Sequence, residues 1–77
     1  MLTQLTSNDL LEIEKYCSKK FKNYRFKHFV YTGLDENEEG FFGVALFLDN
    51  KLVTKLRGEN LKEIKNVISA YCDGLSG

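Results

Sequence analysis

The strongest constraint on the fold is a hydrophobic period that changes twice along a chain of 77 residues. Apolar residues recur every three to four positions at about residues 7–21 and 61–73, which is typical of amphipathic helices. Between these segments the period changes to two, which is typical of strands. The chain is long enough for one domain only. The sequence therefore predicts a single α+β domain over residues 1–77, with the order α-β-β-β-α.

Both expected helices carry signals at their ends. Thr6 can cap the first helix, with Asp9 three residues later as its reciprocal partner. Asn60 can cap the second helix by the same logic, and Gly74 is expected to end it in the left-handed conformation. The expected apolar faces are Leu10, Ile13, Cys17 and Phe21 in the first helix, and Leu61, Ile64, Ile68, Tyr71 and Leu75 in the second.

Three strands are expected at residues 24–32, 41–48 and 51–57. Asp49 and Asn50 form a two-residue turn between the last two, because both residue types tolerate a positive φ. Residues 33–40 are expected to form a loop bounded by glycines. Hairpin connections make the three-stranded sheet antiparallel. Two amphipathic helices then cover one face of the sheet and leave the other face open.

Alternation sorts the strand residues into two faces. The set expected to face the helices is mostly apolar: Phe26, His28, Val30, Phe42, Val44, Leu46, Leu48, Leu52, Thr54 and Leu56. The set expected on the open face is Arg25, Lys27, Phe29, Tyr31, Phe41, Gly43, Ala45, Phe47, Lys51, Val53, Lys55 and Arg57.

The open face is expected to carry five cations and four aromatic rings but no acid. The whole chain is neutral, with eleven Lys and Arg against eleven Asp and Glu. A face rich in apolar and cationic groups is typical of an interaction surface. We therefore expect it to bind a partner through Arg25, Lys27, Phe29, Tyr31, Phe41, Phe47, Lys51, Lys55 and Arg57.

A second candidate surface is the acidic loop, which contains Asp35, Glu36, Glu38 and Glu39. Such a loop can simply be a solvated turn. It can also occupy a basic groove on a partner, because a cluster of carboxylates imitates a row of phosphates. Its spacing lacks the Asp/Asn/Gly order of an EF-hand calcium loop.

No catalytic, metal or cofactor site is expected. His28 falls in the inward set, where a core histidine is the simplest interpretation. Cys17 and Cys72 have no evident activating partner; they are expected as reduced buried thiols, with a disulfide between the helices as the alternative. A tetrahedral zinc site needs four ligands, and these three side chains are too few. We expect a protein that is not an enzyme.

The sequence also bears on origin and location. It has no secretory signal and no apolar run long enough to span a bilayer, so a cytoplasmic location is expected, in the host cell if a phage encodes the protein. Lysine outnumbers arginine nine to two. This bias is typical of AT-rich coding sequence, which is common in phages.

The order α-β-β-β-α resembles that of the double-stranded RNA-binding domain. That family contacts RNA through a basic cluster at the start of its second helix. The matching stretch here, residues 57–62, contains Gly58 and Lys62 with Glu59 and Glu63 beside them. The resemblance is one of topology, and no RNA contact is carried over from it.

The chain also resembles small phage-encoded anti-CRISPR proteins that inhibit type II-A CRISPR nucleases. The similar pieces are Asn8-Asp9-Leu10-Leu11 and Ile68-Ser69-Ala70-Tyr71 with Gly74. That family imitates DNA with acidic side chains at the site that reads the protospacer-adjacent motif. The resemblance implies this role for the four acids of the loop.

The resulting prediction is a small non-catalytic binding protein, a phage or mobile-element inhibitor or regulator. It would act by stoichiometric binding to a macromolecular partner, most simply a protein, and not to a membrane. One alternative is nucleic-acid or nucleotide binding on the open face, where rings stack on bases and cations hold phosphates. A second alternative is a structural homodimer.

Overall fold

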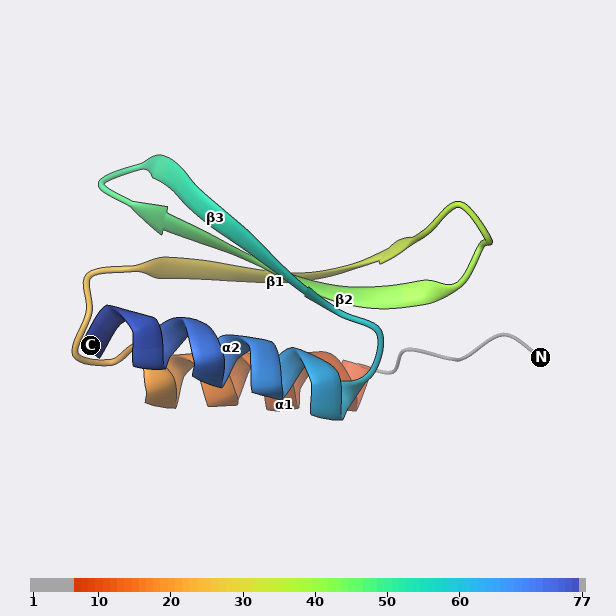
Figure 1. The fold of residues 1–77 in the computed structure, drawn as a ribbon, viewed down its shortest axis with the longest axis horizontal. Helices are drawn as coiled ribbons and strands as arrows, with labels where there is room; N and C mark the ends of the chain where they lie inside the picture. The colour runs from red at the N-terminus through yellow and green to blue at the C-terminus, as the bar shows by residue number, and fades with distance from the viewer. Residues whose placement is uncertain (1–6, 77) are drawn as a thin grey trace.

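The computed structural model describes the backbone of residues 7–76 and the side chains of residues 8–75. Along the chain lie α1 (Ser7–Lys20), β1 (Lys27–Leu34), β2 (Gly40–Leu48), β3 (Lys51–Gly58) and α2 (Leu61–Ser76) (Figure 1). The expected element order and α+β class are confirmed. The expected cap Thr6 lies outside the described residues.

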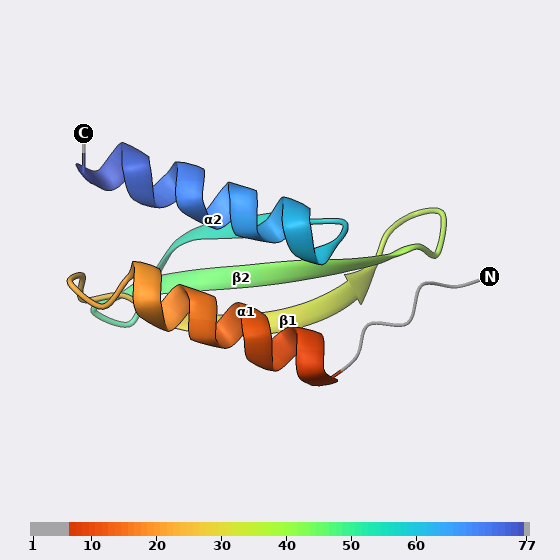
Figure 2. The same cartoon turned by 90° about the horizontal axis from the view of Figure 1, so that it is seen from below.

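The three strands form one antiparallel sheet with the order β1-β2-β3. The two helices lie side by side beneath this sheet and run in the same direction (Figures 1 and 2). Residues 7–76 therefore form two layers, and none of their helices covers the other face of the sheet. This is the open-faced arrangement that the hydrophobic periods predict.

The core lies between the helices and the sheet, and it confirms the expected phasing of β1 and β2. Burying the apolar stripes of two helices on one sheet face is what stabilises an amphipathic arrangement of this kind. The buried side chains that form the core cluster are Ile13, Cys17, Phe21, Phe42, Val44, Leu46, Leu56, Ile64 and Ile68. Each belongs to a helix stripe or to the strand set expected to face inward.

Local signals hold two connections in place. The Asn60 side chain accepts a hydrogen bond of 2.8 Å from the Glu63 amide, and the Glu63 carboxylate accepts one of 3.3 Å from the Glu59 amide. This confirms the expected cap of α2. The turn between β2 and β3 is also confirmed, because Asp49 and Asn50 have φ values of 52° and 68°.

Three expected boundaries are wrong. The loop expected at residues 33–40 is shorter, because β1 continues to Leu34 and β2 begins at Gly40. Gly74 does not end α2 in the left-handed conformation, because no described glycine has a positive φ and the helix continues to Ser76. The first strand begins at Lys27 instead of residue 24. The Tyr24 amide bonds to the Phe21 carbonyl in a turn, and the Phe26 ring packs edge-on against Phe21 at 5.8 Å. Tyr24 and Phe26 therefore alternate in the sequence because both pack on Phe21 at the end of the core, and not because they belong to a strand.

A β-bulge changes the orientation of the first residues of β3. Leu46 pairs with Thr54 but Phe47 pairs with Leu52, so Val53 is an extra residue in the ladder. Leu52 consequently lies on the same face as Phe47, and the expectation that it faces the helices is wrong. Lys51 pairs with Leu48 and shares its face, which corrects its expected place on the open face.

Candidate functional site

The surface of the sheet that faces away from the helices is called the outer face here. Side chains that are directly opposite in an antiparallel ladder lie on the same face, so the register arranges this surface in rows. These rows are Lys27–Phe47–Leu52, Phe29–Ala45–Lys55, Tyr31–Gly43–Arg57 and Gly33–Phe41. The structure thus brings together most of the residues that the sequence predicts as one binding surface.

In the half of the outer face near the acidic loop, aromatic rings lie over glycines. A Cβ atom on Gly43 would stand 2.3 Å from the Tyr31 ring, and one on Gly33 would stand 2.6 Å from the Phe41 ring. The Arg57 guanidinium lies over the Phe41 ring, 4.0 Å from its centroid. A glycine in a strand is typical of such a close approach. This half is a flat layer of rings that leaves both glycines little room for substitution.

In the other half, apolar side chains project into solvent. Phe29 is 58% exposed, Leu52 49% and Val53 46%, and Phe47 meets Phe29 edge-on at 5.4 Å. These four residues are called the apolar patch. Leu52 belongs to it only because of the bulge, and sequence reasoning placed it in the core. The one signal in the sequence was the apolar pair Leu52-Val53, which breaks strict alternation.

The cations around the outer face differ in their pairing. Arg25 lies ahead of β1 and pairs with Asp49 at 3.5 Å, and Arg57 approaches Asp35 at 3.9 Å. The exposed side chains of Lys27 and Lys55, in contrast, form no ion pair or hydrogen bond within the described part of the chain. Both lysines flank the apolar patch in the ladder. The patch therefore carries unneutralised positive charge at its sides.

The acidic loop divides into a structural residue and three exposed ones. The Asp35 carboxylate accepts hydrogen bonds from the amides of Asn37 and Glu39, at 2.8 and 2.9 Å. These bonds hold the tight turn in which Glu38 has a φ of 60°. Glu36, Glu38 and Glu39 are exposed. Asp35 thus builds the loop, and the other three acids form its surface.

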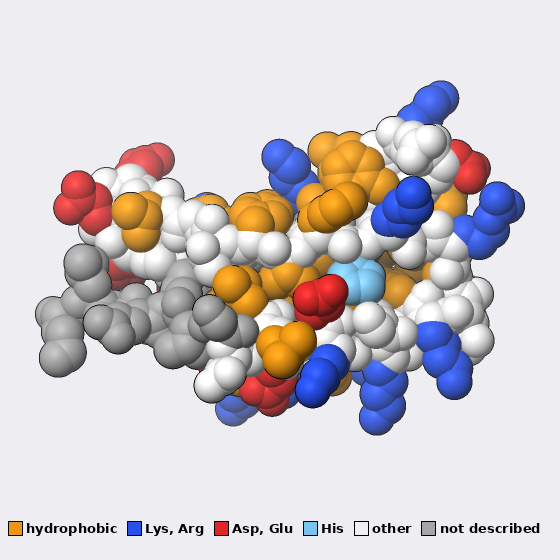
Figure 3. Space-filling model, turned by 180° about the vertical axis from the view of Figure 1, so that it is seen from behind, with side chains coloured by type: hydrophobic (Ala, Val, Ile, Leu, Met, Phe, Trp, Pro, Cys, Tyr) orange, Lys and Arg blue, Asp and Glu red, His pale blue; other side chains and the backbone are white. Residues whose placement is uncertain are grey.

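Charge is separated along the length of the molecule, which extends 39 Å. Figure 3 shows acidic side chains at the end formed by the β1–β2 loop. It shows hydrophobic side chains gathered among Lys and Arg in the other half. The acidic loop therefore lies at the end of the molecule away from the half that combines apolar side chains with most of the cations drawn in this view.

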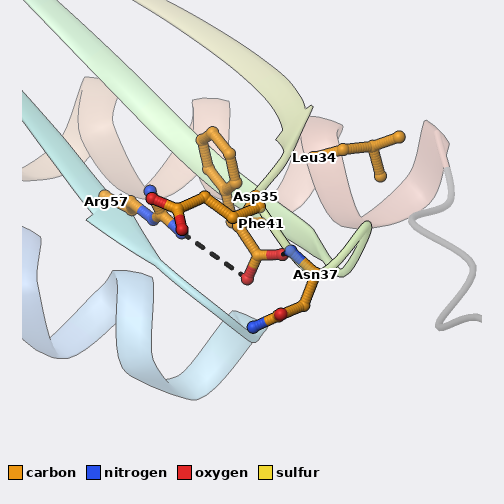
Figure 4. A pocket seen from close by; sticks show the side chains of 6 residues that line it. Leu34, Asp35, Asn37, Phe41 and Arg57 are labelled. Atoms are coloured by element: carbon orange, nitrogen blue, oxygen red, sulfur yellow. Dashed lines mark hydrogen bonds and ion pairs between the residues drawn. The ribbon is translucent and has the colours of Figure 1, made fainter.

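A cavity of about 450 Å³ lies where the loop meets the outer face. Its lining residues are Leu34, Asp35, Glu36, Asn37, Phe41 and Arg57. Figure 4 shows the Arg57–Asp35 ion pair within it, and Leu34 pointing away from that pair. The charged groups here already pair with each other, and Glu36 leaves the lining net negative.

A second cavity, of about 270 Å³, lies between α1 and the start of β1. His28 lines it together with Cys17 and the aromatic residues Phe21, Tyr24 and Phe26. The Cys17 thiol is buried, and Cys72 donates a hydrogen bond of 3.4 Å to the Lys20 carbonyl. The two cysteines are thus thiols, which excludes the alternative of a disulfide between them. No group of three metal-binding side chains occurs among the described residues.

The Cys17 thiol is predicted to react slowly. Burial, with a smaller contribution from Glu14, raises its pKa from 9.0 to about 12. Since the thiolate is the nucleophile, we expect Cys17 in a Cys72→Ser variant to resist a thiol reagent at about pH 8 until denaturant is added. Labelling at native rates equal to those in denaturant would contradict this burial.

The same shift predicts a pH dependence of stability. The folded state holds the Cys17 proton more tightly than the unfolded state does, so this thiol favours folding fully below about pH 9 and progressively less as the pH rises toward 12. The difference in unfolding free energy between the parent and Cys17→Ala should therefore shrink above pH 9. Urea titrations at two pH values measure it.

Comparisons with known proteins assign neither a family nor a function to the chain. No protein-family model matches the chain, and neither a curated protein nor a solved structure matches it. Within residues 7–76, no helix is long and apolar enough to cross a membrane. The fold and its surfaces therefore define a class, a two-layer α+β domain with an open, partly apolar sheet face.

Proposed function

We propose that this chain is a non-catalytic binding protein that contacts a macromolecular partner, most simply a protein, through the outer face of its sheet. The observation that carries the proposal is the apolar patch. Three of its side chains are about half exposed on the sheet face that lies opposite α1 and α2. Burying apolar area of this kind favours association by about 25 cal/mol per Å².

The non-catalytic part of the proposal rests on the chemistry of the nucleophiles. Cys17 keeps its proton and is buried, so it is a poor nucleophile. His28 lies among aromatic side chains in the smaller cavity. Stoichiometric binding requires no reactive nucleophile or base. It requires an exposed contact surface, which the apolar patch provides.

A phage or mobile-element inhibitor acting in the host cytoplasm is the form of this proposal that the anti-CRISPR resemblance implies. Phosphate imitation would then fall to Glu36, Glu38 and Glu39, since the Asp35 carboxylate is engaged by the loop amides. Three acids on one tip are a small surface, so we assign the main contact to the outer face.

The proposal predicts that partner binding depends on Phe29. The Phe29→Asp variant places a charge at the centre of the patch and should lose the partner. Leu11→Asp is the matched control, because Leu11 is 51% exposed on α1, away from the outer face. Affinity capture from extracts of the source cells, quantified by mass spectrometry and by nucleic-acid staining, measures both variants against the parent.

The expected result is a partner retained by the parent and by Leu11→Asp but depleted about tenfold or more by Phe29→Asp, a loss of about 1.4 kcal/mol. Equal capture by all three proteins would show that the outer face is not the contact. Circular dichroism of each variant checks that it is folded.

A further inference from the structure

The outer face carries features that specify the chemistry of what it binds. We infer that it docks a single acidic segment of a partner protein, with apolar side chains placed between two carboxylates. This inference rests on the proposed function and adds to it the chemical class and the size of the bound element.

The first observation is the position of Lys27 and Lys55, the lysines of the outer face, which form no ion pair within the described part of the chain. Lys27 begins the row that contains Phe47 and Leu52, and Lys55 ends the neighbouring row that contains Phe29. They therefore stand at diagonally opposite corners of the apolar patch. From strand spacing, their Cα atoms are about 10 Å apart across the sheet and about 7 Å apart along it, or about 12 Å in total.

A matching ligand places carboxylates about 12 Å apart with apolar groups between them. Two positions seven or eight residues apart on a helix are separated by about that distance, as are two positions four residues apart on a strand. Both lysines lack partners within the described part of the chain. A carboxylate that approaches them therefore breaks no existing ion pair.

The second observation is the size of the outer face. Its three strands place the edge-strand axes about 10 Å apart, which is about the diameter of one helix. The hairpin connections at both ends rise away from the helical layer (Figure 1). The sheet covers only about 350 Å², estimated from strand length and spacing, whereas a stable dimer interface buries about 800 Å² per partner. The face suits one segment better than a second copy of the chain.

The third observation is the charge at the other end of the molecule. Glu36, Glu38 and Glu39 are exposed on the loop that ends the same sheet. A nucleic-acid strand that followed the length of the face would bring its phosphates toward these carboxylates, which repels it. A short acidic peptide segment can satisfy Lys27 and Lys55 without reaching the loop.

Selection of random peptides displayed on phage tests the inference without knowledge of the natural partner. We expect the enriched peptides to carry Asp or Glu on both sides of aromatic or aliphatic residues. One such peptide is then synthesised with a fluorescent label. Its affinity is measured by anisotropy for the parent, for a Lys27→Glu, Lys55→Glu double variant, and for a control with the same charge change, Lys15→Glu with Lys62→Glu.

The expected result is an affinity at least about tenfold weaker for the Lys27, Lys55 double variant, about 1.4 kcal/mol, and little change for the control. A peptide with its acids replaced by lysine should regain affinity for the double variant. Raising the salt concentration should weaken binding of the original peptide, because exposed charges are screened.

Several outcomes overturn the inference, and they separate it from the proposed function. Two outcomes refute the acidic segment but leave the proposed function standing. In the first, the enriched peptides lose affinity for Phe29→Asp but contain no acidic residues. In the second, they bind the Lys27→Glu, Lys55→Glu double variant as tightly as the parent. Salt-sensitive binding of an oligothymidine to the same lysines, tighter than that of the peptide, assigns the face to nucleic acid. Sedimentation of a dimer that Phe29→Asp dissociates assigns it to a second copy. If no enriched peptide depends on Phe29, the proposed function fails as well.

Discussion

Phe42→Ala is expected to lower the free energy of unfolding by about 3–5 kcal/mol, because it removes a buried ring and leaves a cavity. Phe42 is 2% exposed and belongs to the core cluster from the inner face of β2. A domain of this size is expected to have about 3–5 kcal/mol of stability in all. The variant should therefore be largely unfolded, which urea titration followed by circular dichroism measures.

Phe29→Ala is the matched control, since it makes the same chemical change on the neighbouring strand but on the outer face. Phe29 is 58% exposed, so its loss should change the unfolding free energy by less than about 1 kcal/mol. If the two variants were equally destabilised, the orientation of the whole sheet would be wrong, and the proposed contact surface would be part of the core.

Gly58→Ala is expected to destabilise the protein by about 3 kcal/mol, at the upper end of the range for overpacking. A Cβ atom at this position would stand 2.4 Å from the backbone nitrogen of Ile64 and 2.6 Å from its Cα. The obstacle is backbone in the first turn of α2, so a rotamer change cannot relieve the clash. Either the helix or the end of β3 has to move, and thermal unfolding should show a lower midpoint.

Gly74→Ala is the control for this substitution. Nothing lies within 4 Å of a Cβ atom on Gly74, and the residue is helical. Alanine is a better helix former than glycine by up to about 1 kcal/mol, so this variant should be as stable as the parent or more so. A destabilised Gly74→Ala would contradict a continuous helix through this position.

The sequence alone predicted the architecture because its signals are local. The apolar residues of each helix, such as Phe21 in α1 and Ile64 and Ile68 in α2, recur every three to four positions. Only a helix places residues with this period on one face. Asp49-Asn50 tolerates positive φ at both turn positions, which fixes the β2–β3 hairpin. The inward orientation of Phe42 and Val44 then follows from alternation along β2.

The outer face could be predicted only in part. Lys27, Phe29, Tyr31, Phe41, Phe47, Lys55 and Arg57 are on it as expected. The pattern could not show that the Tyr31 ring covers Gly43, and the prediction did not include the bonds from loop amides to the Asp35 carboxylate. The contact of Tyr31 with Gly43 depends on which residues stand opposite in the ladder, and local sequence does not state that. The Asp35 bonds are local, because they reach amides two and four residues later, and Asp is typical of such turns. The function assigned to these residues stays a proposal.

Side-chain period, turn chemistry and helix capping were determined by the sequence itself, because each depends on the backbone preferences of residues that are close in the chain. The tertiary structure decided which side of the sheet Leu52 occupies, and that Lys27 and Lys55 form no ion pair with any described residue. The physical reason is that a bulge and an ion pair both depend on contacts between segments that are far apart in the sequence. One extra residue at Val53 reverses the faces of the residues before it, and the register with β2 establishes that reversal.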